Sequence, residues 1–166
     1  VDDYLVKSDA IIAKVLSDKG SPYLRSIIIN RGSKHKINLG MVVMDGAYLV
    51  GKVVEVNYLS SRVLLLSDLN SKIPVIVEPN TVFSILSGTG KDYGIIQYSK
   101  KYEDIKSESI IYTSGAGSLF KAGIPIGRMN INNLSDEKKV EFFSDFSQLK
   151  FVKGVSFKKS ENKWDG

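Results

Sequence analysis

The chain has 166 residues, of which 43% are hydrophobic and 25% charged, the proportions of a folded globular protein. It has no cysteine and one histidine, so disulfides, thiolate metal sites and multi-histidine metal sites are excluded. The formal net charge is +5, but arginine occurs only at 25, 31, 62 and 128, too sparsely for a nucleic-acid-binding surface.

The N-terminal residues carry no membrane signal of their own. No apolar run approaches the ~18 residues of a transmembrane helix, and the acidic first residues do not form a signal peptide. We therefore expect any membrane anchor to lie upstream of this chain. Residues 1–8 are interpreted as a linker or the end of an upstream helix.

From residue 10 onward, short β-branched or apolar runs alternate with turn residues, which indicates strands. The first run is 10–16, and eleven more follow at 24–30, 41–45, 48–56, 62–68, 72–78, 81–86, 93–99, 109–113, 124–131, 139–143 and 151–157. The segment "SGTGKD" (87–92) is interpreted as a hairpin turn, because it lacks the spacing of a phosphate loop. The spacing of the runs favours barrels over alternating βα units.

One phrase occurs twice. "VLLLSD" begins at Val63 and "VEFFSD" at Val140, and the same spacing separates Asp68 from Asp145. Upstream, 27–43 aligns with 110–126, which matches Gly40 to Gly123 and, after a deletion, Gly51 to Gly127. The best account is a duplicated all-β unit of about 75 residues, each copy stabilised by packing against its twin. Chance similarity between short β-runs is the alternative.

The chain is therefore expected to be all-β, with two small six-stranded β-barrels packed together and at most a short N-terminal helix remnant. We assign the first barrel to 9–79, the second to 80–157 and a disordered basic tail to 158–166. The pattern leaves open a C-terminal strand that crosses back to complete the first barrel. The glycines expected at structural turns are Gly32, Gly40, Gly51, Gly115, Gly117, Gly123 and Gly127.

Two small barrels suggest a chymotrypsin-type hydrolase, and His35, Asp68 and Ser118 occur in the chain order of that class. His35 lies in a lysine-flanked polar loop, and the glycines around Ser118 are already explained by a turn. Catalysis is therefore the less favoured alternative. No set of acidic residues has metal-ligand spacing, so neither a metal nor a cofactor is expected.

Two other features suggest binding. Leu119 and Phe120 follow a glycine-rich loop, where exposed apolar side chains often contact a partner protein. The alternative is that Phe120 folds back over the end of the barrel. Lysines crowd "LKFVKGVSFKKSENK" near the C-terminus, which suggests an anionic partner such as lipid headgroups, nucleic acid or an acidic cell-wall polymer. The favoured alternative is a solvated terminal tail.

Several blocks together resemble the rod shape-determining protein MreC family. They are "INRGSKHKINLGMVV", "LVGKVVEV", "SSRVLLLSDLNSKIPVIV" and "TSGAGSLFKAGIPIG". The likeness runs from about Ser21 to Phe157, although His35 and the polar segment "NINNLSDEKKVEFF" depart from the family pattern.

The resemblance implies two β-barrels outside the cytoplasmic membrane, similar in topology to chymotrypsin-like barrels but without a triad. They would follow a transmembrane helix and a coiled coil that this chain lacks. It also implies a scaffold that forms dimers or filaments, binds the class B penicillin-binding transpeptidase of elongation and MreD, and acts indirectly with MreB. We therefore expect a non-enzymatic, periplasmic scaffold for cell-wall elongation and rod-shape maintenance. A serine hydrolase and a module that binds wall polymer are the alternatives.

Overall fold

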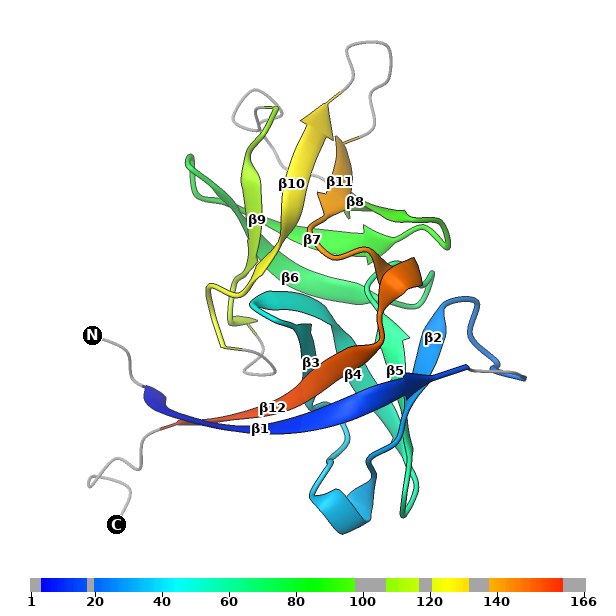
Figure 1. Ribbon diagram of the computed structural model, residues 1–166. Helices are drawn as coiled ribbons and strands as arrows, with labels where there is room; N and C mark the ends of the chain where they lie inside the picture. The colour runs from blue at the N-terminus through cyan, green and yellow to red at the C-terminus, as the bar shows by residue number, and fades with distance from the viewer. Residues whose placement is uncertain (1–3, 18–19, 98–106, 117–120, 132–137, 160–166) are drawn as a thin grey trace.

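The computed structural model describes residues 4–17, 20–97, 107–116, 121–131 and 138–159 (Figure 1). Each of the twelve runs expected from the sequence overlaps one strand. The strands are β1 Tyr4–Leu16, β2 Ser26–Ile29, β3 Val42–Asp45, β4 Tyr48–Val56, β5 Ser61–Leu65, β6 Lys72–Glu78, β7 Val82–Gly88, β8 Tyr93–Gln97, β9 Ile110–Thr113, β10 Pro125–Ile131, β11 Lys138–Phe142 and β12 Phe151–Lys159. The described residues also form the short 3-10 helices η1 Ser33–His35 and η4 Phe146–Gln148.

The strands close into two six-stranded antiparallel barrels, as expected. Barrel 1 has the ring order β12-β1-β2-β5-β4-β3, and barrel 2 has the order β6-β7-β8-β11-β10-β9. The chain enters barrel 2 at β6 and returns to barrel 1 at β12. The ranges expected from the sequence, 9–79 for barrel 1 and 80–157 for barrel 2, are therefore wrong in two places: 72–78 belong to barrel 2, and 151–157 belong to barrel 1. Pairing decides this: β6 bonds with β7 and β9, whereas β12 bonds with β1 and β3.

The expectation for the chain ends also needs correction. Residues from Tyr4 onward form a strand rather than the end of a helix, because β12 satisfies the backbone groups of β1. The two strands make a long ribbon in which Tyr4 pairs with Lys159 (Figure 1). The basic tail expected from 158 therefore begins as the end of β12, and 160–166 lie outside the described residues.

The two rings match position by position when they are read from β12 and from β6. In this match β5 of barrel 1 and β11 of barrel 2 hold equivalent places, so the repeated phrase marks equivalent strands. The backbone agrees, because the N–H of Leu66 donates to Val50 O at 3.0 Å and the N–H of Phe143 donates to Ile126 O at 3.0 Å.

The final Asp of each phrase shapes the crossover from one barrel to the other. Asp68 Oδ1 accepts from the N–H of Asn70 at 2.8 Å, and Asp145 Oδ1 accepts from the N–H of Ser147 at 3.0 Å. A short side chain that binds the backbone two residues ahead stabilises a turn. The phrase recurs because β5 leads into β6 through the same turn by which β11 leads into β12.

The upstream part of the sequence alignment is wrong. It pairs 27–43 with 110–126, and so matches β2 with β9, although β2 is equivalent to β8. Gly51 and Gly127 are equivalent, but they lie inside β4 and β10 rather than in turns. A Cβ at Gly51 would lie 2.2 Å from Leu64 O, and one at Gly127 would lie 2.1 Å from Glu141 O, so the neighbouring strand excludes a side chain at both places.

The other glycines differ in their setting. Gly40, Gly115 and Gly123 have positive φ of 82°, 77° and 88°, which fits turns. A Cβ at Gly32 would meet Asn57 O at 2.1 Å. Gly117 lies outside the described residues.

Apolar side chains join the barrels. One cluster fills barrel 1, while the cluster of barrel 2 also includes five residues from the barrel 1 side, which are Val42, Met44, Leu49, Leu66 and Val155. Phe146, in the β11–β12 crossover, packs against both clusters. Within the described residues, no helix has the length and hydropathy needed to cross a membrane.

Candidate functional site

The outer surface of barrel 2 carries an apolar face on β9, β6 and β7. Phe83 is 68% exposed and Ile85 is 39% exposed, although both lie in a strand. Register places Ile76 beside both Phe83 and Tyr112, and places Pro74 beside Ile85. We call these residues the barrel 2 apolar face, which consists of Pro74, Ile76, Phe83, Ile85 and Tyr112.

The equivalent surface of barrel 1 serves as an internal comparison. There Ile12 pairs with Lys153, and Lys14 pairs with Phe151. The ring match and the crossover turns show which positions are equivalent. Ile12 is the counterpart of Phe83, and Lys153 is the counterpart of Ile76. Lys14 is the counterpart of Ile85, and Phe151 is the counterpart of Pro74. Lysine occupies two of the four positions in barrel 1, so the fold does not need apolar residues there. Outward strand positions are usually polar, and their apolar character in barrel 2 therefore indicates a contact surface.

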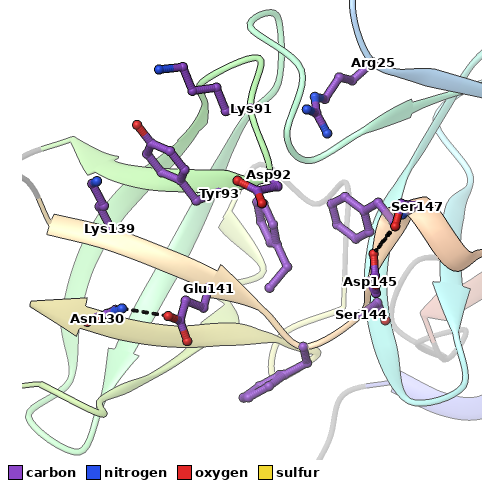
Figure 2. Close-up of a pocket in the computed structure, with 13 residues that line it drawn as sticks. Arg25, Lys91, Asp92, Tyr93, Asn130, Lys139, Glu141, Ser144, Asp145 and Ser147 are labelled. Atoms are coloured by element: carbon purple, nitrogen blue, oxygen red, sulfur yellow. Dashed lines mark hydrogen bonds between the residues drawn. The ribbon is translucent and has the colours of Figure 1, made fainter.

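A second feature is a groove of about 960 Å³ at the seam between the barrels, shown in Figure 2. Its lining comes from β8, β10, β11, the β7–β8 turn, the β11–β12 crossover and the segment before β2. Phe142 and Phe146 stack in it with ring centroids 4.8 Å apart. Three cationic side chains line the groove, which are Arg25, Lys91 and Lys139.

Most of the acidic groups in the groove already have partners. Asn130 Nδ2 donates to Glu141 at 2.6 Å. The hydroxyl and the backbone N–H of Ser147 donate to Asp145, and these two bonds hold the pKa of that carboxyl below its ordinary value (Figure 2). Asp92 is exposed on the β7–β8 turn. The Lys139 ammonium lies 4.7 Å from the centroid of the Tyr93 ring.

The bonding of Asp68 and His35 does not fit a catalytic triad. Asp68 is fully buried, and its carboxylate accepts from the N–H groups of Arg25 and Asn70 at 2.7 and 2.8 Å. His35 ends η1, where its Nδ1 accepts from the N–H of Gly32 at 3.1 Å. Both groups therefore have structural partners other than each other, and Ser118 lies outside the described residues.

The loop residues Leu119 and Phe120 also lie outside the described residues, so their part in binding stays a prediction. Sequence reasoning missed Phe83 and Ile85, because "TVFSIL" reads as a strand without showing which of its faces is covered. Among the residues that the structure describes, no three acidic or histidine side chains converge on a possible metal site.

Together these features define a class: a double β-barrel module whose notable sites are an apolar sheet face and an inter-barrel groove. The family model for rod shape-determining protein MreC, barrel core, matches residues 15–155. The chain belongs to this family, which consists of shape-determining structural proteins and not of enzymes.

Curated relatives and solved structures agree with this family assignment. The cell shape-determining protein MreC of Cereibacter sphaeroides is 32% identical over 139 residues, which is 84% of this chain and 46% of that relative. The chain thus spans less than half the length of that curated relative. The crystal structure of MreC from Pseudomonas aeruginosa matches with a TM-score of 0.80 and 27% identity, over 89% of this chain and 99% of that one.

A third match comes from a complex between penicillin-binding protein PBP2 and MreC of Helicobacter pylori. Its TM-score is 0.63 at 16% identity, over 90% of this chain and 99% of that one. At this identity the match concerns the fold alone.

Proposed function

We propose that this chain is the barrel part of a non-enzymatic scaffold for cell-wall elongation and rod-shape maintenance. Its partner would be the class B penicillin-binding transpeptidase of elongation, on the extracytoplasmic side of the bacterial cytoplasmic membrane. Membership of the MreC family supports this role, as does the Helicobacter pylori relative that was solved with PBP2. An upstream segment would anchor the scaffold.

The observation that carries the proposal is the barrel 2 apolar face. Phe83 is the most exposed member of this face at 68%, and aromatic side chains dominate the binding energy of many interfaces. Lys72 and Glu78 lie at the two ends of β6, which gives the apolar centre a polar rim. We assign this face to the transpeptidase and expect apolar side chains on the partner surface.

The mechanism follows from differential affinity. A scaffold shifts a transpeptidase toward one conformation only by binding that conformation more tightly than the others. No reactive group is needed, and the exposed members of the face are chemically inert. Contacts with MreD, an indirect link to MreB, and self-association as a dimer or filament complete the proposal.

The test is calorimetric titration of this chain with the soluble extracytoplasmic part of the transpeptidase from the same bacterium. Phe83→Asp should weaken binding by about thirtyfold, since truncating a hot spot costs ~2 kcal/mol or more. Ile12→Asp is the matched control, because Ile12 holds the equivalent place in barrel 1 and is 59% exposed. Its affinity should stay at the wild-type value.

A third variant, Phe120→Asp, tests the loop predicted from the sequence. Loss of binding in Phe120→Asp alone would move the contact to the loop. Equal affinities for Phe83→Asp and wild type would refute the assignment of the barrel 2 apolar face. No binding by any protein, with circular dichroism showing all of them folded, would refute the proposal that this part of the chain holds the transpeptidase.

A further inference from the structure

The inter-barrel groove contains an arginine whose side chain is fixed but not fully used. The backbone N–H of Arg25 donates to Asp68 Oδ2 at 2.7 Å, and its Nε donates to Gly90 O at 2.9 Å. These bonds hold the residue at the seam, where it lines the groove (Figure 2). The two terminal guanidinium nitrogens make no hydrogen bond to any residue that the structure describes.

A guanidinium in this state suits a carboxylate. Its planar fork can donate two parallel hydrogen bonds to one carboxylate, and prior fixation lowers the entropy lost on binding. Lys91 and Asp92 are both exposed on the neighbouring turn, where their opposite charges offset each other. Glu141 and Asp145 are engaged by Asn130 and Ser147, so the Arg25 guanidinium, with its terminal nitrogens facing the groove lining, is the group that best suits an anion.

The rest of the groove suits an apolar side chain. The stacked rings of Phe142 and Phe146 line it, and Phe146 is anchored in both cores. At about 960 Å³ the groove is at the upper end of ligand sites, and it runs from β10 across the seam to Arg25. An extended segment of several residues would fill it better than a single small anion.

We propose that this groove is a second protein-docking site, which binds an extended segment of another protein. A side-chain or terminal carboxylate of the segment binds the guanidinium of Arg25, and an adjacent aromatic side chain packs on Phe142 and Phe146. The barrel 2 apolar face lies on β9, β6 and β7, whereas the groove lies on β8, β10, β11 and the β11–β12 crossover. One chain can therefore hold two partners at once.

The test uses a defined probe and does not depend on the transpeptidase. Acetyl-phenylalanyl-glutamyl amide is titrated into the isotope-labelled chain and followed by two-dimensional NMR, with acetyl-phenylalanyl-glutaminyl amide as the matched probe. The glutamyl peptide should shift the amides of Tyr93, Phe142 and Ser144 saturably, with a millimolar Kd. The glutaminyl peptide should bind about tenfold more weakly, because charged hydrogen bonds are the stronger ones.

Three variants make the result specific. Arg25→Gln should weaken binding of the glutamyl peptide about tenfold, Arg25→Lys should be intermediate because it keeps the charge without the fork, and Arg31→Gln should match the wild type. The NMR spectrum of each variant also reports its fold. Equal affinity for the two peptides, retained affinity in Arg25→Gln, or no saturable shift at millimolar peptide would each overturn the proposal.

Discussion

Replacement of Asp68 by alanine should destabilise the protein far more than the same change at its twin, Asp145. Asp68 is fully buried, and its carboxylate accepts from Arg25 N at 2.7 Å, from Asn70 N at 2.8 Å and from Asn70 Nδ2 at 3.0 Å. Asp145 forms the same turn but is exposed, and its partners are the N–H and hydroxyl of Ser147.

The expected magnitudes follow from burial. Asp68→Ala leaves the part-buried backbone N–H groups of Arg25 and Asn70 without their acceptor, and each unsatisfied donor of this kind costs ~1–3 kcal/mol, so we expect a loss of about 3 kcal/mol. At Asp145, which is exposed, water replaces the lost acceptor, so the loss should be several times smaller. Asp68→Asn keeps one carbonyl oxygen and should fall between these two values.

Urea unfolding followed by far-ultraviolet circular dichroism measures the difference. With a slope of ~2 kcal/mol per molar urea, Asp68→Ala should lower the midpoint by roughly 1.5 M at an unchanged slope. Asp145→Ala should lower it by less than about 0.5 M. Equal midpoints for the two variants would refute the reasoning, because burial would then not decide the cost of the shared turn.

Two further outcomes are expected. Gly127→Ala would place a Cβ 2.1 Å from Glu141 O, so the two strands must separate. We expect a loss of ~2–3 kcal/mol in the free energy of unfolding and a Tm lower by about 6–9 °C in calorimetry. An unchanged Tm would contradict this close approach. Ser147→Ala should raise the pKa of Asp145 toward its ordinary value, measured by NMR titration of the carboxyl carbon. Because the folded pKa is the lower one, the stabilisation by Ser147 is present above the unfolded pKa and is lost as pH falls through the folded pKa. An identical titration in both proteins would exclude the bonds from Ser147 as the cause.

The repeated phrase shows what the two barrels share. Val63 and Val140 are both fully buried in equivalent strands, and the Ser-Asp pair that follows turns the chain toward the other barrel. The outward positions of the strands that follow, β12 and β6, are free to differ. The same strand positions carry Lys153 in barrel 1 and Ile76 in barrel 2, which gives each barrel a different surface on one framework.

The sequence by itself determined the strands. Period-2 alternation and turn residues are local properties, and all twelve runs overlap strands of the structure. The equivalence of 63–66 and 140–143 was also visible, since buried strands and Asx turns depend on short spacings.

Only the tertiary structure decided which strands close which barrel. Hydrogen bonds between strands far apart in the chain assign β6 to barrel 2 and β12 to barrel 1, and they also make residues from Tyr4 onward a strand. The same long-range pairing places Phe83 beside Ile76 and brings Arg25 to the groove. No local pattern encodes these neighbours, because backbone pairing is nearly independent of side-chain identity, and burial is known only when the partner strand is known.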